Sequence, residues 1–129
     1  MAQPRPFITC HVLDTVAGKP AANMKATLSL VSPASANATF SATTNTDGRV
    51  TAWESDSTTL KATIEEAKKS LKEEDQMIWA ICFQSGEYYG AGKTFWPEVE
   101  LRFFTKMSEE HYHVPLLLGP WSYTTYRGS

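Results

Sequence analysis

The residues of this chain best suited to chemistry are three histidines and one arginine: His11, His111, His113 and Arg49. An unperturbed imidazole titrates near neutral pH, so a positioned histidine can take a proton from water or return one. Arg49 directly follows the turn sequence at 45–48. Its planar guanidinium can bind the carbonyl and imide edge of a purine-like ring through two parallel hydrogen bonds. Together these residue types suit proton transfer on an oxygen-rich substrate that a cation holds in place.

Alternation of side chains places the histidines on strand faces that look away from the expected core. In the segment 7–14, Ile8, Cys10 and Val12 share one face and His11 lies on the other. The segment 111–118 repeats this pattern, with Tyr112, Val114, Leu116 and Leu118 on the core face and His111, His113, Pro115 and Leu117 on the other. A strand histidine can also be purely structural. The three together could bind zinc, although no Cys, Asp or Glu adds the usual remaining ligand.

The last eight residues are aromatic and strand-like almost to the final position, although chain ends are usually frayed. We therefore expect the segment 122–129 to be docked on the rest of the domain. Its polar face, which carries Ser122, Thr124 and Tyr126, could line the same cleft as His113.

Most of the chain is expected to form short strands separated by turns, a pattern typical of an all-β sandwich. The expected strands are 7–14, 25–31, 38–43, 49–54, 77–84, 98–104, 111–118 and 121–127. One segment differs, because Leu60, Ile64, Ala67 and Leu71 recur at helical spacing. This spacing predicts one amphipathic helix over residues 57–73, with Asp56 or Ser57 as the N-cap, lying against the sandwich.

Length and composition narrow the classes of protein. At 129 residues the chain is the size of one domain, so residues 1–129 are expected to form a single unit. A net charge of −2 gives no electrostatic case for a nucleic-acid partner. Cys10 and Cys82 each lie in an apolar run, which predicts two free, buried thiols.

The expected location is the cytoplasm, with no membrane association. No segment approaches the ~18 apolar residues of a membrane span, and the N-terminus lacks the pattern of a signal peptide. The chain ends in Arg127-Gly128-Ser129, which is not the Ser-Lys-Leu ending of peroxisomal proteins, and a peroxisome reached by another route stays open as the alternative.

Taken in order, these features resemble the 5-hydroxyisourate hydrolases, the enzymatic branch of the transthyretin-like family. The resemblance covers nearly the whole chain. The matching segments are His11-Val12-Leu13-Asp14-Thr15, Gly18-Lys19-Pro20-Ala21, Thr46-Asp47-Gly48-Arg49, Phe95-Trp96-Pro97-Glu98-Val99-Glu100, His111-Tyr112-His113-Val114-Pro115-Leu116-Leu117-Leu118 and Tyr126-Arg127-Gly128-Ser129. The last of these is the signature usually taken to separate the hydrolases from the hormone carriers.

The resemblance implies a transthyretin-like β-sandwich of two four-stranded sheets, assembled as a homotetramer with its active sites in a channel between dimers. It implies hydrolysis of the cyclic amide 5-hydroxyisourate to 2-oxo-4-hydroxy-4-carboxy-5-ureidoimidazoline in urate degradation, with no metal or cofactor. Carried over by position, the catalytic residues are His11, Arg49 and His113, and either histidine could be the base. The substrate-binding residues are then Tyr126, Arg127, Gly128, Ser129 and His111.

Two other interpretations stay open at this point. A transthyretin-like carrier would hold a small aromatic ligand without chemistry, and such carriers have Lys, Glu and Thr at the positions of His11, Arg49 and His113. A generic sandwich used for protein association would leave these three residues without a role. The chain departs from the family pattern in the helical segment 57–73, which is longer than usual, and in the hairpin at 119–122.

Overall fold

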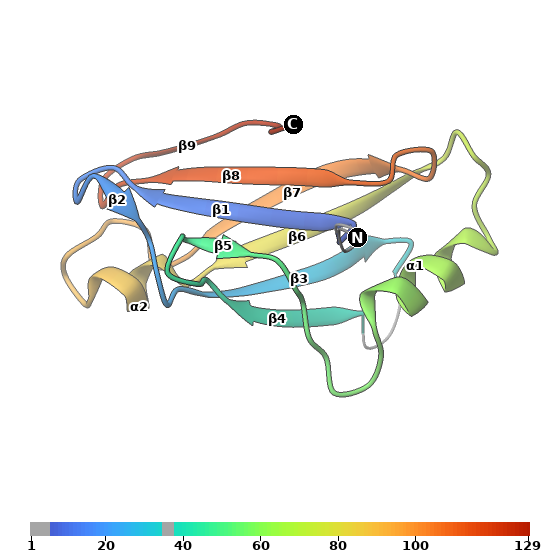
Figure 1. Ribbon diagram of the computed structural model, residues 1–129, viewed down its shortest axis with the longest axis horizontal. Helices are drawn as coiled ribbons and strands as arrows, with labels where there is room; N and C mark the ends of the chain where they lie inside the picture. The colour runs from blue at the N-terminus through green and yellow to red at the C-terminus, as the bar shows by residue number, and fades with distance from the viewer. Residues whose placement is uncertain (1–5, 35–37) are drawn as a thin grey trace, which may run out of the picture.

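The computed structural model describes residues 6–34 and 38–129, and it confirms an all-β sandwich of two packed sheets (Figure 1). The first sheet contains β1 (Ile8–Asp14), β2 (Lys19–Pro20), β5 (Arg49–Val50), β8 (Tyr112–Leu118) and β9 (Tyr123–Thr125). The second contains β3 (Lys25–Ser32), β4 (Thr39–Thr43), β6 (Gln76–Phe83) and β7 (Val99–Lys106), in the order β4-β3-β6-β7.

The first sheet has five strands where four were expected. β2 and β5 are each two residues long, and both pair with the same edge of β1. β2 pairs with Leu13 and Asp14, whereas β5 pairs with Cys10 and His11. The two short strands therefore follow one another along β1 and together fill one strand position.

The pairing of β1 with β8 joins the two ends of the chain. The two strands run parallel, with Thr9 opposite His113 and His11 opposite Pro115. Figure 1 shows β1 in blue beside β8 in red-orange, with β9 on the far edge of the sheet. The site-bearing segments 7–14 and 111–118 are thus neighbours in space.

The alternation expected for these strands is confirmed. Cys10, Val12, Leu116 and Leu118 are fully buried between the sheets, while His11 and His113 on the opposite faces are half-buried. The second sheet contributes Leu28, Phe40, Met77, Trp79, Ile81 and Phe83, each 1% exposed or less. Burial of each such large apolar side chain stabilises the fold by about 1.5–3 kcal/mol, so the core fixes the register that turns the histidines outward.

The expected strand over 49–54 is wrong beyond Val50. Val50 pairs with Cys10 of the first sheet, whereas Glu54 forms an isolated bridge to Ser41 of the second. The segment therefore crosses from one sheet to the other and cannot continue as a single strand. The indole N–H of Trp53 donates to the carbonyl of Ile8 at 2.8 Å and fixes this crossing.

The amphipathic helix is present but shorter than the expected 57–73. Helix α1 spans Leu60–Lys68, and its N-cap is Thr59 instead of Asp56 or Ser57. The Thr59 hydroxyl accepts from the backbone N–H of Ala62 at 3.1 Å, which starts the helix there. After Lys68 the chain continues in tighter turns, in which each N–H bonds to the carbonyl three residues before it.

A second helix, α2 (Ser85–Tyr89), was not expected. The Tyr88 hydroxyl donates to the buried Asp14 carboxylate at 3.0 Å and ties α2 to the end of β1. In the described part of the chain, neither helix is long and apolar enough to cross a membrane.

Candidate active site

The turn before Arg49 fixes where its side chain starts. The Asn45 side-chain oxygen accepts a hydrogen bond from the backbone N–H of Arg49 at 3.0 Å. Gly48 has a φ of 73°, and a Cβ at this position would collide with the Val12 carbonyl oxygen, so only glycine fits. The Val12 N–H donates to the Gly48 carbonyl at 2.7 Å. This hydrogen bond holds the turn against β1, and Arg49 lies directly opposite His11.

The structure brings His11, Arg49 and His113 together on the outer face of the first sheet. His11 and Arg49 are a cross-strand pair, and the side chains of such a pair leave the same face of a sheet. His113 comes from the other neighbour of β1, and its ring centroid lies 6.5 Å from that of His11. A small planar molecule on this face can therefore contact two imidazoles and one guanidinium.

The surroundings of His11 favour its neutral form. Burial lowers the pKa of His11 below its ordinary value, and the Arg49 cation lowers it further. The backbone and carboxylate of Asp47 act in the opposite direction but do not offset these two effects. An imidazole that stays neutral near pH 7 can accept a proton, as a general base must.

His111, expected to neighbour the site, reaches His113 through a threonine. The Thr9 hydroxyl oxygen lies 2.7 Å from Nδ1 of His113 and 3.4 Å from Nε2 of His111. Nδ1 of His111 in turn lies 2.7 Å from the carbonyl oxygen of Pro6. The two imidazoles are nearly parallel, with their centroids 6.5 Å apart. Sequence reasoning missed Thr9, although alternation places it on the same face of β1 as His11.

Among the C-terminal residues, Gly128 contacts His113 through its backbone. Its backbone N–H donates to the His113 carbonyl at 2.9 Å, so the end of the chain is docked on β8. A Cβ at Gly128 would lie 2.7 Å from Cδ2 of the His113 ring. Gly128 therefore packs against a catalytic candidate instead of offering a side chain to substrate.

The residues beside Gly128 differ in how they relate to the site. Tyr126 is exposed and lines a pocket of about 490 Å³ that His113 and Arg127 also line. The Arg127 guanidinium lies 4.8 Å from the centre of the Tyr112 ring, and its Nη2 lies 3.9 Å from a carboxylate oxygen of Glu109. Ser129 is exposed. The structure thus holds Arg127 against protein groups and leaves Tyr126 at the surface near His113.

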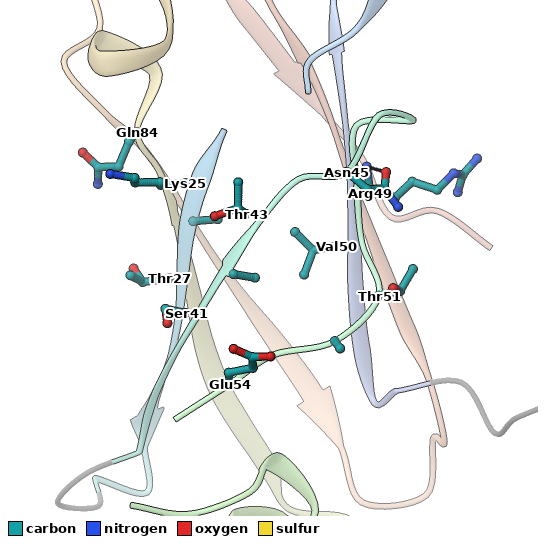
Figure 2. A pocket seen from close by; sticks show the side chains of 13 residues that line it. Lys25, Thr27, Ser41, Thr43, Asn45, Arg49, Val50, Thr51, Glu54 and Gln84 are labelled. Atoms are coloured by element: carbon teal, nitrogen blue, oxygen red, sulfur yellow. Dashed lines mark hydrogen bonds between the residues drawn. The ribbon is translucent and has the colours of Figure 1, made fainter. Parts of the chain in front are cut away.

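A groove of about 660 Å³ lies between the edge of the second sheet and the crossing segment that follows β5. Polar side chains of Lys25, Thr27, Ser41, Thr43 and Gln84 line one side of it. Figure 2 shows that the Arg49 side chain points away from this groove. Arg49 borders this groove, whereas His11, His111 and His113 do not line it.

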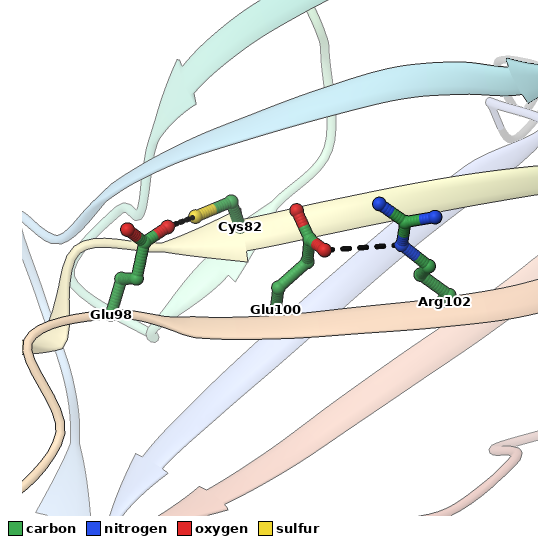
Figure 3. Close-up of polar contacts among 4 residues, drawn as sticks. All are labelled: Cys82, Glu98, Glu100 and Arg102. Carbon is green, nitrogen blue, oxygen red and sulfur yellow. Dashed lines mark hydrogen bonds and ion pairs between the residues drawn. The ribbon is translucent and has the colours of Figure 1, made fainter.

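The prediction of two free, buried thiols is only partly confirmed. Both thiols are free, but Cys10 is buried and Cys82 only half-buried. Cys82 lies on the outer face of the second sheet because its neighbours Ile81 and Phe83 point into the core. There its thiol donates to the Glu98 carboxylate, next to the Glu100–Arg102 ion pair (Figure 3). Burial and the Glu98 carboxylate raise the pKa of Cys82 to about 12, so it is not a nucleophile at neutral pH.

The zinc interpretation of the histidines finds no geometric support. Over residues 6–34 and 38–129, no group of three or more His, Cys, Asp or Glu side chains is arranged to hold a metal ion. Both ring nitrogens of His111 already have hydrogen-bonding partners within the protein.

A two-sheet sandwich with this strand order is the fold of the transthyretin-like proteins. The chain belongs to the HIUase/Transthyretin family, whose model matches residues 8–128.

Known proteins agree with this assignment. A 5-hydroxyisourate hydrolase of Deinococcus radiodurans is 39% identical, covering 96% of this chain and 97% of that protein. A probable 5-hydroxyisourate hydrolase of Schizosaccharomyces pombe is 38% identical, covering 96% and 92%. The solved structure of transthyretin from Sparus aurata superposes with a TM-score of 0.71 over 96% of this chain and 97% of that one. Its sequence identity is 20%, so this likeness shows the fold alone.

Proposed function

We propose that this protein hydrolyses 5-hydroxyisourate, using water to open one ring of a flat, oxygen-rich bicyclic lactam. The observation that carries the proposal is the meeting of His11, Arg49 and His113 on one face of the first sheet. Relatives about 40% identical over nearly their whole length bear the name of this activity.

Arg49 is the substrate-holding group in this proposal. Its guanidinium can bind the carbonyl and imide edge of the lactam in a bidentate manner. The same cation can stabilise the negative oxygen that forms when water adds to the ring carbonyl. Burial and, after it, the Arg49 cation opposite His11 lower the pKa of that imidazole, which links substrate binding to the protonation of the site.

The histidines move the protons. One neutral imidazole takes a proton from water as the water oxygen bonds to the carbonyl carbon, and the carbonyl electron pair moves to the oxygen beside Arg49. When this tetrahedral species collapses, the ring C–N bond breaks and the leaving nitrogen takes a proton from an imidazolium. Removing a histidine that transfers the proton should lower turnover by about 10²–10⁴-fold.

The C-terminal residues complete the site in the same proposal. Tyr126 lies near His113 at the edge of the pocket, so it is suited to contact substrate. Gly128 holds the His113 ring in place through van der Waals contact. Arg127 and Ser129 follow the same segment, and we place them at the boundary of the binding site.

We place the site at an interface within a homotetramer. The catalytic face carries an exposed Arg49 and two half-buried histidines, and a second copy of the chain would shield them from water. Contacts between Arg49 and substrate strengthen when water is excluded. The exposed side chains of Val16 and Trp121, 73% and 66% accessible, offer apolar surface for such an association. Sedimentation of the purified protein at a monomer mass of 14.3 kDa would contradict the tetramer.

The direct test is a turnover assay on freshly generated substrate. Urate oxidase would produce 5-hydroxyisourate in the cuvette, and its ultraviolet decay would be followed with and without the protein. We expect rapid decay with the parent protein and spontaneous decay with Arg49→Glu, which carries the residue of the hormone carriers. Lys61→Glu, at an exposed lysine of α1, is the matched control and should keep full activity. Spontaneous decay with the folded parent protein would favour the carrier interpretation.

A further inference from the structure

A chain of four groups runs from the backbone of the N-terminal segment to the catalytic face. It begins at the Pro6 carbonyl and passes through His111 and the Thr9 hydroxyl to Nδ1 of His113, with contacts of 2.7, 3.4 and 2.7 Å. None of the four belongs to the core. Thr9 and His113 lie near the starts of β1 and β8, and Pro6 and His111 precede these two strands.

Counting donors and acceptors fixes which group donates in each contact of this hydrogen-bond chain. A carbonyl oxygen can only accept, so Nδ1 of His111 must carry a proton. In neutral His111 the other nitrogen, Nε2, is then an acceptor, and the Thr9 hydroxyl donates its single proton to it. The Thr9 oxygen can now only accept from His113, so Nδ1 of His113 must carry a proton as well.

We infer that Thr9 and His111 are positioning residues that hold His113 in the tautomer protonated at Nδ1, which makes Nε2 of His113 the general base of the reaction. In a neutral imidazole with its proton on Nδ1, the lone pair is on Nε2. The inference rests on the proposed hydrolysis and resolves which of the two histidines acts first. His11, whose pKa is lowered by burial and by Arg49, is then the partner that helps to hold substrate in its neutral form.

The proton balance of the step follows from this arrangement. Nε2 of His113 takes a proton from water as the water oxygen bonds to the carbonyl carbon, and the C=O electron pair moves to the oxygen beside Arg49. The resulting imidazolium keeps its Nδ1 proton hydrogen-bonded to Thr9, which stabilises the positive charge through a charge-assisted bond. The Nε2 proton is then available to the leaving nitrogen, and neutral His113 is restored.

The tautomer can be read without substrate. Two-bond proton–nitrogen correlation spectra of the protein labelled with ¹⁵N-histidine distinguish a protonated from an unprotonated ring nitrogen. We expect His113 of the parent protein to be protonated at Nδ1, and Thr9→Val, which keeps the shape but removes the hydroxyl, to lose this preference. His111→Ala should shift His113 toward the Nε2-protonated form, because Thr9 is then able to donate to Nδ1. A parent protein with His113 protonated at Nε2 would overturn the inference.

Kinetics provide the second measurement. Thr9→Val should lower kcat about 100-fold with KM within about twofold, since wrong orientation of a catalytic base impairs the transition state and spares binding. Thr9→Ser keeps the hydroxyl and should restore most of kcat. Thr39→Val, at an exposed threonine of β4, is the matched control and should leave kcat unchanged. Equal kcat for Thr9→Val and the parent would also overturn the inference.

The two experiments separate the inference from the proposed function. If the parent protein fails to hydrolyse 5-hydroxyisourate but its spectrum shows His113 protonated at Nδ1, the hydrogen-bond chain stands and the substrate assignment fails. If the parent protein is active and the spectrum shows the other tautomer, the hydrolase assignment stands and the inference fails.

Discussion

Replacing Gly128 with alanine adds one methyl group against the His113 ring. The new Cβ would lie 2.7 Å from Cδ2 of that ring, and 3.2 Å from both the His113 carbonyl oxygen and Cγ of Pro115. Carbon atoms in contact prefer about 3.5–4.0 Å, so the ring and the methyl group must separate by about 1 Å. The hydrogen bond from the Gly128 N–H to the His113 carbonyl holds the two backbones together, so most of the displacement falls on the imidazole.

A catalytic group misplaced by about 1 Å can lose about 10²-fold in rate, equivalent to about 2.7 kcal/mol in the activation barrier. We therefore expect kcat of Gly128→Ala to fall about 100-fold in the 5-hydroxyisourate decay assay. Stability should change by less than about 1 kcal/mol, because the substituted residue lies near the chain end. Gly92→Ala, where an added Cβ meets no atom within 4 Å, is the control and should keep kcat. Folded Gly128→Ala with kcat within threefold of the parent would refute the reasoning.

Two further predictions follow from the turn that presents Arg49. Arg49→Met removes the cation that lowers the pKa of His11, so that pKa should rise. An NMR titration of the His11 ring should show this rise, and an unchanged pKa would refute the influence of Arg49 on His11. Gly48→Ala combines a positive φ with a collision against the Val12 carbonyl and should lower the free energy of unfolding by more than about 2 kcal/mol in urea titrations. Gly18→Ala has a similar φ of 69° but open space around it, and should lose only about 1 kcal/mol; equal losses for the two variants would refute the steric argument.

Much of the fold could be predicted from the sequence, because strands with one buried face have a strong period of two. The core positions of 7–14 and 111–118 follow directly from that period, and with them the outward direction of His11 and His113. Helix α1 was predicted from the spacing of its apolar residues. Its start was not, since Asp56 and Ser57 are by type better N-caps than Thr59, whose side chain makes the capping hydrogen bond.

What could not be predicted depends on pairing between distant segments. That two short strands share one edge of β1 is a consequence of where the turns at 18 and 48 place the chain. The contact of Thr9 with two histidines requires the parallel register of β1 and β8, which leaves no local pattern in the sequence. The match to the family predicted the meeting of His11, Arg49 and His113, and the geometry supplies its physical cause.

The parallel pairing of β1 and β8 also has a consequence for how the protein is made. Thr9 and His113 are separated by 104 positions in the sequence, so the catalytic face closes a loop that includes most of the chain. Contacts of this range are slow to form, because the entropy of loop closure is lost before the contacts compensate for it. During synthesis β8, the partner strand of β1, leaves the ribosome after α1 and the second sheet. The pairing of Thr9 with His113 can therefore form only after β8 has been synthesised, and the recovery of turnover on refolding should trail the recovery of helical signal.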